Sequence, residues 1–316
     1  MNSALERTTL PDVPLALRRA TRPSAEGRAG AVAIAVAAIL WSSGGVVIKL
    51  SSLSAWTMVF GRAFVAALFF LVVLRVSLRG ARLSTAVAYA GTMITFILAT
   101  KLTTAANAVF LQYSGSAYVL VLGPWLLRER LRRTDVACAM ASLIGVSLVL
   151  LGGADAGRWS GNLVAAASGV FFASTIVLMR RDARAGSALP STALGNVIAA
   201  AIAAPFATFD RATFTPTSLL VVGYLGAIGI GLAYLLFTHG LKTTSASKAS
   251  VLAALEPVLN PLWVALAISE RPSGWSLVGG ALVVVAIATS ATLSTAPAHS
   301  RSPHVPLLPP GEGARG

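Results

Sequence analysis

Long, uninterrupted apolar runs dominate this chain of 316 residues. Ten of them approach the roughly 20 residues that a helix needs to cross a hydrocarbon core about 30 Å thick. Their apolar positions are continuous rather than alternating, which excludes a β-barrel and requires each run to satisfy its backbone groups within a helix. The pattern predicts an all-α integral membrane protein with ten transmembrane helices, at residues 30–48, 55–74, 84–100, 105–127, 135–152, 161–179, 188–206, 217–239, 249–269 and 274–294.

The pattern also repeats within the chain, because residues 101–130 reappear in diverged form as residues 242–271, at a spacing of 141. Five helices per copy is an odd number, so the second copy enters the membrane inverted. Inverted repeats are typical of transporters, in which the two halves move against each other about a central site. The matched residues are Lys101, Thr103, Ala105, Ala108, Leu111, Glu129 and Arg130, with Lys242, Thr244, Ala246, Ala249, Leu252, Glu270 and Arg271.

Polar, proline-containing segments flank the apolar runs. We expect residues 1–29 and 295–316 to be disordered cytoplasmic tails. Between them, residues 30–152 form the first five-helix repeat and residues 161–294 form the second.

The basic residues predict the orientation in the membrane. Of the 25 Lys and Arg residues, 19 fall on the side of the N-terminus, five fall on the opposite side, and Arg62 lies inside a span. Because cytoplasmic loops carry the excess of basic residues, we expect both termini in the cytoplasm and the protein in a plasma or inner membrane. The net charge of +14 does not indicate nucleic-acid binding, since the charge lies in loops at the membrane surface.

Composition argues against enzymatic chemistry. The chain is 56% hydrophobic and only 11% charged, with one cysteine and three histidines. Cys138 has no partner for an intrachain disulfide and no metal-ligand neighbours, and the histidines are scattered. No glycine-rich phosphate-binding loop is present. We therefore expect no cofactor, no metal site and no enzymatic activity.

An acidic residue inside an apolar run is the foremost functional candidate. Glu256 lies midway along the ninth predicted span, directly before Pro257 and five residues before Pro261. The two prolines remove backbone hydrogen bonds, so this helix can bend at Pro257 and Pro261 and present polar groups to a cavity. The carboxylate could bind a cationic group or exchange a proton; alternatively, it caps freed backbone groups or pairs with a basic residue between the halves.

Other polar and aromatic side chains inside spans extend this set. Arg62 could bind a carboxylate of the cargo or of the protein, or its side chain could extend towards the outer surface. Asn107, Gln112 and Tyr118 cannot share one helix face, so some of them join helices. The candidates for cargo binding or coupling are Trp41, Arg62, Asn107, Gln112, Tyr118, Asn196, Glu256, Asn260 and Trp263.

Six short motifs resemble the two EamA domains of the drug/metabolite transporter superfamily. Those of the first domain lie at residues 41–49, 103–108 and 128–131, and those of the second at residues 244–246, 256–258 and 269–272. The resemblance covers roughly residues 31–294 and implies ten helices, cytoplasmic termini and a central pathway. First repeats of this kind commonly carry a proline in the fourth span, where this chain has Gly115 to supply the bend.

The sequence thus predicts a secondary transporter embedded in the lipid bilayer. The resemblance implies an exporter of small, amino-acid-like polar compounds that works by alternating access, and Glu256 allows proton coupling. Two alternatives stay open: a multidrug efflux carrier with a wide aromatic cavity, and a non-transporting membrane scaffold or sensor whose halves do not move.

Overall fold

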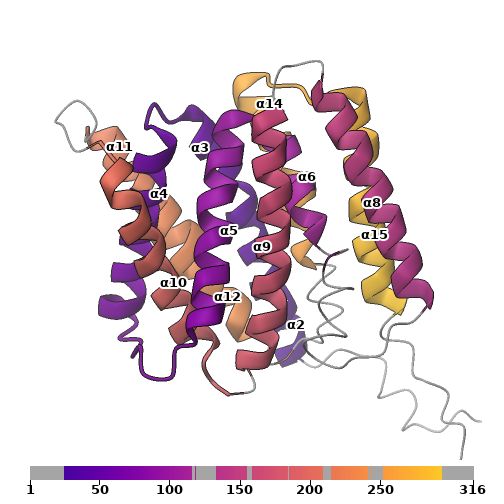
Figure 1. Ribbon diagram of the computed structural model, residues 1–316. Helices are drawn as coiled ribbons and strands as arrows, with labels where there is room; N and C mark the ends of the chain where they lie inside the picture. The colour runs from indigo at the N-terminus through magenta and orange to yellow at the C-terminus, as the bar shows by residue number, and fades with distance from the viewer. Residues whose placement is uncertain are drawn as a thin grey trace, which may run out of the picture.

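Helices account for all the regular structure in the described part of the chain. The computed structural model describes residues 25–115, 118, 133–154, 159–183, 185–208, 215–240, 243 and 252–293, and no β-strand lies in these ranges. Figure 1 shows the helices running side by side as a bundle. The elements are α2 (Ala25–Ser42), α3 (Gly44–Leu50), α4 (Ala55–Leu68), η1 (Phe69–Val73), α5 (Leu83–Leu102), α6 (Ala105–Tyr113), α8 (Arg133–Ala154), α9 (Trp159–Ala183), α10 (Ala188–Ala203), η2 (Ala204–Phe206), α11 (Pro216–Gly223), η3 (Tyr224–Leu232), α12 (Ala233–Gly240), α14 (Leu255–Ile268) and α15 (Gly274–Leu293).

Six segments of the described residues are long and apolar enough to cross a membrane. They are Arg28–Leu50, Ala55–Val73, Leu83–Leu102, Trp159–Met179, Ala188–Phe206 and Pro216–Gly240. Three shorter apolar helices are Val136–Val149, Leu255–Ile268 and Gly274–Ala286. The predicted span 105–127 is described only to residue 115 and at Tyr118, so the count of ten stays a prediction.

The N-terminal boundary differs from the sequence-based one. Helix α2 begins at Ala25, inside the range predicted as a tail. Ala25, Glu26 and Arg28 have good helix propensity, which offsets the unfavourable Gly27. Residues 1–24 and 294–316 lie outside the described residues, as do Glu129 and Lys242.

The bundle surface is apolar, as expected for contact with lipid. Leu220 and Leu266 are 74% and 71% exposed. Small residues let helices approach inside: a Cβ on Gly145 of α8 would lie 2.6 Å from the carbonyl oxygen of Gly279 in α15. Such close backbone contact is a common way to pack membrane helices, and α8 and α15 run side by side in Figure 1.

The core lies between the two sequence copies. The most extensive helix contacts all join an element of residues 25–154 to one of residues 159–293. Helix α5 packs against α9 and α10, α2 packs against α12 and α14, and α8 packs against α15. Each copy therefore buries its helices mainly against the other copy.

Two helices are interrupted at matching places in the copies. Helix α6 ends at Tyr113 and is followed by a turn at Ser114, and a turn at Ala254 precedes α14. At the spacing of 141, Ala254 corresponds to Tyr113. Irregular backbone is tolerated at membrane depth where protein buries it or where it borders a cavity.

Candidate functional site

The two interrupted helices touch at their interruptions. The hydroxyl of Tyr113 donates a 2.6 Å hydrogen bond to Oε2 of Glu256 and lies 3.5 Å from the carbonyl oxygen of Ala253. Pro257 has no N–H to donate to the carbonyl four residues earlier, which is that of Ala253, so this oxygen lacks its usual helical donor. The proline next to Glu256 thus creates a polar spot that a regular helix would lack.

Glu256 occupies the first turn of α14, where the helix dipole favours a negative charge. The residue is partly buried, and the neighbouring Pro257 and Pro261 are buried. The third predicted hinge residue, Gly115, packs on the backbone of α9, where a Cβ would lie 2.5 Å from the carbonyl oxygen of Gly169. Bending at these three residues stays a prediction.

A buried arginine completes the charged part of the site. Arg62 of α4 is only 8% exposed, so its side chain does not extend to the surface. Tyr89, Tyr234 and Glu256 lie within electrostatic range of its guanidinium. Its Nε and Nη1 atoms are buried and have no hydrogen-bond partner among the described residues.

Aromatic rings surround this charge. Tyr234 of α12 lies 5.7 Å from the ring of Tyr89 in α5 and 5.2 Å from the ring of Trp41 in α2, measured between centroids. Trp41 also packs on Phe237, at 5.1 Å, and its Nε1 is buried without a partner among the described residues. Edge-to-face and tilted ring pairs of this kind stabilise their neighbours' positions.

Asn260 lies one turn beyond Glu256 on α14. It is 1% exposed, and neither atom of its side-chain amide has a hydrogen-bond partner in the described part of the chain. The amide lies against Gly45 of α3, where a Cβ would overlap Oδ1 and come within 2.6 Å of Nδ2. Nearby, Nε1 of Trp263 donates to Oγ of Ser42 at 2.9 Å and joins α14 to α2.

Asn107 joins helices instead of lying with Glu256. Its Nδ2 donates to Oδ1 of Asn162 in α9 at 3.2 Å, and its Oδ1 accepts from Oγ of Ser276 in α15 at 2.7 Å. Both bonds cross from one copy to the other. This side chain therefore stabilises the interface between the copies.

The remaining candidates, Asn196, Gln112 and Tyr118, are buried to different extents. Asn196 of α10 donates to the hydroxyl of Tyr89 at 3.3 Å and so holds the ring beside Arg62. Gln112 is buried in α6, and Tyr118 is partly buried. A gap too narrow for water borders this region, lined by Val59, Arg62, Ala63, Met93, Ile97 and Asn196.

In the described residues, no group of His, Cys, Asp and Glu side chains could hold a metal.

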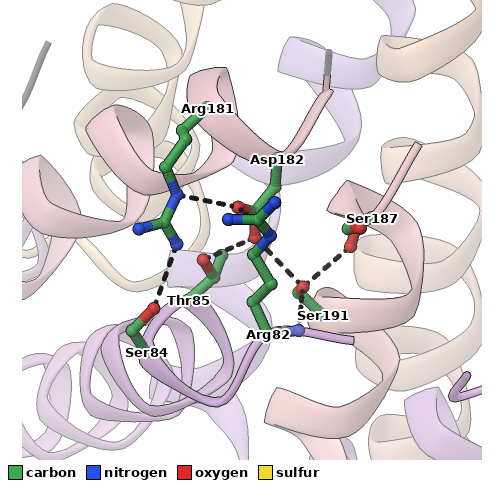
Figure 2. Close-up of polar contacts among 7 residues, drawn as sticks. All are labelled: Arg82, Ser84, Thr85, Arg181, Asp182, Ser187 and Ser191. Carbon is green, nitrogen blue, oxygen red and sulfur yellow. Dashed lines mark hydrogen bonds and ion pairs between the residues drawn. The ribbon is translucent and has the colours of Figure 1, made fainter. Parts of the chain in front are cut away.

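A second charged cluster joins three helix ends (Figure 2). Asp182 near the end of α9 has no exposed surface, and its Oδ2 accepts from Oγ1 of Thr85 at 2.6 Å and Oγ of Ser191 at 3.2 Å. Its Oδ1 pairs with Nε of Arg181 at 3.1 Å and Nε of Arg82 at 3.3 Å. One sequence feature indicates this cluster weakly, because Asp182 directly follows the two arginines Arg180 and Arg181.

An ion pair forms at the other end of α5. Nζ of Lys49 lies 2.9 Å from Oε2 of Glu270 and donates to the carbonyl oxygen of Thr103 at 2.6 Å. Oε1 of Glu270 accepts from the backbone N–H of Ala105 at 2.8 Å. Because α5 has 20 residues, about 30 Å of helix separates this pair from the Asp182 cluster.

Comparison with known proteins identifies the family. The model of the EamA-like transporter family matches residues 28–151 and 159–292. The aromatic amino acid exporter YddG of Ancylobacter novellus is 30% identical over 213 residues, which cover 63% of this chain and 71% of the exporter. An uncharacterized transporter of Archaeoglobus fulgidus is 27% identical over 202 residues, covering 62% of this chain and 70% of that protein.

The fold also matches a protein of known crystal structure. The TM-score is 0.59 at 23% sequence identity, and the match covers 86% of this chain and 98% of the other. At this identity the likeness concerns the fold alone. Taken with the apolar helices and the matched interruptions, the family match establishes that this chain belongs to the EamA-like transporter family and is a multi-pass membrane transporter.

Proposed function

We propose that this protein is a secondary transporter that exports small, amino-acid-like polar compounds by alternating access. The hydrogen bond between Tyr113 and Glu256 carries the proposal, because it lies where the interrupted helices of the two copies meet. Transporters built from inverted repeats bind cargo between the repeats, next to interrupted helices. The name of the exporter from Ancylobacter novellus supports both the outward direction and an amino-acid cargo.

The grouping of basic residues at the two ends of α5 agrees with the predicted topology, in which the copies are inverted and both termini are cytoplasmic. Arg82 and Arg181 lie together near the start of α5, whereas Lys49 and Lys101 lie near its end. The first pair belongs to the predicted cytoplasmic side and the second to the opposite side.

Glu256 is the proposed coupling residue. A carboxylate can hold a proton or a cationic group of the cargo, and occupation by one weakens binding of the other. If Glu256 exchanges cargo for a proton on one side of the membrane and the proton for cargo on the other, the proton gradient would drive export of the cargo. Because the carboxylate is shielded from water by the surrounding residues, it binds a proton or a cationic group more strongly than a carboxylate in water does.

Transport by the purified protein in liposomes tests the proposal. Wild-type protein should transport one or more standard amino acids, at a rate that depends on the pH gradient. Glu256→Gln keeps the shape of the side chain and removes its charge, so the variant should insert and fold but lose coupled transport. Tyr113→Phe is the matched variant, because it removes the hydrogen bond and keeps the carboxylate; coupling should persist at a changed rate.

Three results would contradict the proposal. Normal transport with unchanged pH dependence in Glu256→Gln would assign Glu256 to structure. Transport of diverse organic cations but of no amino acid would favour a multidrug carrier. No transport of amino acids, organic cations or sugars by folded protein would favour a scaffold or sensor.

A further inference from the structure

Arg62 is a buried cation within electrostatic range of Glu256, but the two side chains form no ion pair. Arg62 is 8% exposed, and the ion pairs of the described residues do not include it. Two of its three side-chain nitrogens are buried with no hydrogen-bond partner in the described ranges. Burying a charge without hydrogen bonds costs several kcal/mol, so a membrane protein keeps such a residue where another group can compensate for it.

The neighbours of Arg62 only partly compensate for this charge. Tyr89 and Tyr234 are neutral phenols, and Tyr89 already accepts a hydrogen bond from Asn196. Glu256 interacts with Arg62 through its charge but accepts its hydrogen bond from Tyr113. The free N–H groups therefore remain available to a further acceptor.

The geometry of a guanidinium favours one class of acceptor. Its planar fork of N–H donors matches the two oxygens of a carboxylate, and such charge-assisted bonds are about twice as strong as neutral ones. We propose that Arg62 binds the carboxylate of the cargo, so that compounds lacking a free carboxylate are not carried. This proposal rests on the proposed function and specifies one contact of its site.

The aromatic rings next to Arg62 fit this role. Trp41, Tyr234 and Tyr89 form a continuous series of ring contacts, and Tyr89 and Tyr234 lie within electrostatic range of the guanidinium. An apolar wall lowers the local dielectric and strengthens the attraction between a guanidinium and a carboxylate. It also limits the hydration of a charge that enters the site.

The test compares ligands that differ only in the carboxylate. Thermal stabilisation of the detergent-purified protein is measured with a mixture of the standard L-amino acids other than Asp and Glu, with the matching α-amides and with the matching decarboxylated amines. We expect the amino acids alone to raise the melting temperature. In Arg62→Gln, binding should weaken about ten- to hundredfold, in line with the loss of charged hydrogen bonds. Arg62→Lys should keep part of it, because the charge remains.

Arg271→Gln serves as the control for removing a positive charge, since Arg271 is exposed and lies in the segment between α14 and α15. It should bind like wild type. Equal stabilisation by amides or amines, or no stabilisation by any mixture, would overturn the carboxylate proposal whatever the variants do. Transport in liposomes separates the two proposals: amides carried as well as acids would refute only the carboxylate requirement, whereas acids bound through Arg62 but never transported would refute only the transport function.

Discussion

At the scale of single residues, the contact between Gly45 and Asn260 gives a sharp prediction. Gly45→Ala should destabilise the protein by about 1–3 kcal/mol, because the added Cβ overlaps the buried amide of Asn260 and the packed interior cannot move aside without strain. The melting temperature in detergent measures this. Gly44→Ala is the matched control: the nearest atom to its added Cβ, on Leu225, is 4.0 Å away, so its stability should hardly change.

Combining substitutions checks the cause. Asn260→Ala removes the amide that the new methyl would meet, so it should restore stability to Gly45→Ala. If the double variant melts as low as Gly45→Ala, the loss has another origin.

Single residues also show where sequence reasoning reaches its limit. Glu256 was predictable as a functional candidate, since a carboxylate in an apolar run is costly enough to stand out. Its partner Tyr113 was not, because the two residues are 143 positions apart and only the packing of α6 on α14 brings them together.

At the scale of elements, the Asp182 cluster should hold the ends of α5, α9 and α10 together. Asp182→Ala leaves Arg82 and Arg181 without their carboxylate and the hydroxyl of Thr85 without its acceptor. The side chains of Arg82 and Arg181 are 44% and 36% exposed, so water can hydrate them in the variant. Hydrogen bonds to a charged group contribute about 1.5–3 kcal/mol, and we expect a loss of stability of that order, measured as a fall in melting temperature.

Ser84→Ala is the control for this element, because it removes only the exposed hydrogen bond from Arg181, at 3.1 Å. Its effect should stay within about 0.5 kcal/mol. Equal effects of the two substitutions would mean that the buried carboxylate does not stabilise the helix ends.

Helix positions followed from hydropathy, whereas helix interruptions did not. The predicted run 84–100 corresponds to α5 at Leu83–Leu102, since an apolar segment that faces lipid satisfies its backbone groups within a helix. The turns at Ser114 and Ala254 each involve about one residue, which a hydropathy window averages away. In the sequence, only Gly115 and Pro257, which lie within three residues of these turns, indicated an interruption.

At the scale of the whole molecule, the Lys49–Glu270 pair joins the two copies at one end of the bundle. Alternating access requires that contact between the copies at each end break and re-form, so altering this pair should change transport. Lys49→Glu and Glu270→Lys each place like charges together, and we expect each to slow transport several-fold. The double exchange restores opposite charges and should recover part of the rate, measured in liposomes.

Recovery should be incomplete, because exchanged side chains cannot reproduce the bonds to Thr103 and to the N–H of Ala105. Arg271→Gln again serves as the control, since Arg271 is exposed. A double exchange no faster than the slower single variant would show that the attraction between these two charges does not govern the transport cycle.

The packing of each copy against the other has a consequence for biosynthesis. When the ribosome has released only the first copy, α5 lacks α9 and α10, α2 lacks α12 and α14, and α8 lacks α15. The partners of buried polar groups such as Asn107 are then still untranslated. The early helices must wait in the lipid as a loosely associated group, and the protein acquires its final structure only when α15, the last helix of the described residues, has entered the membrane.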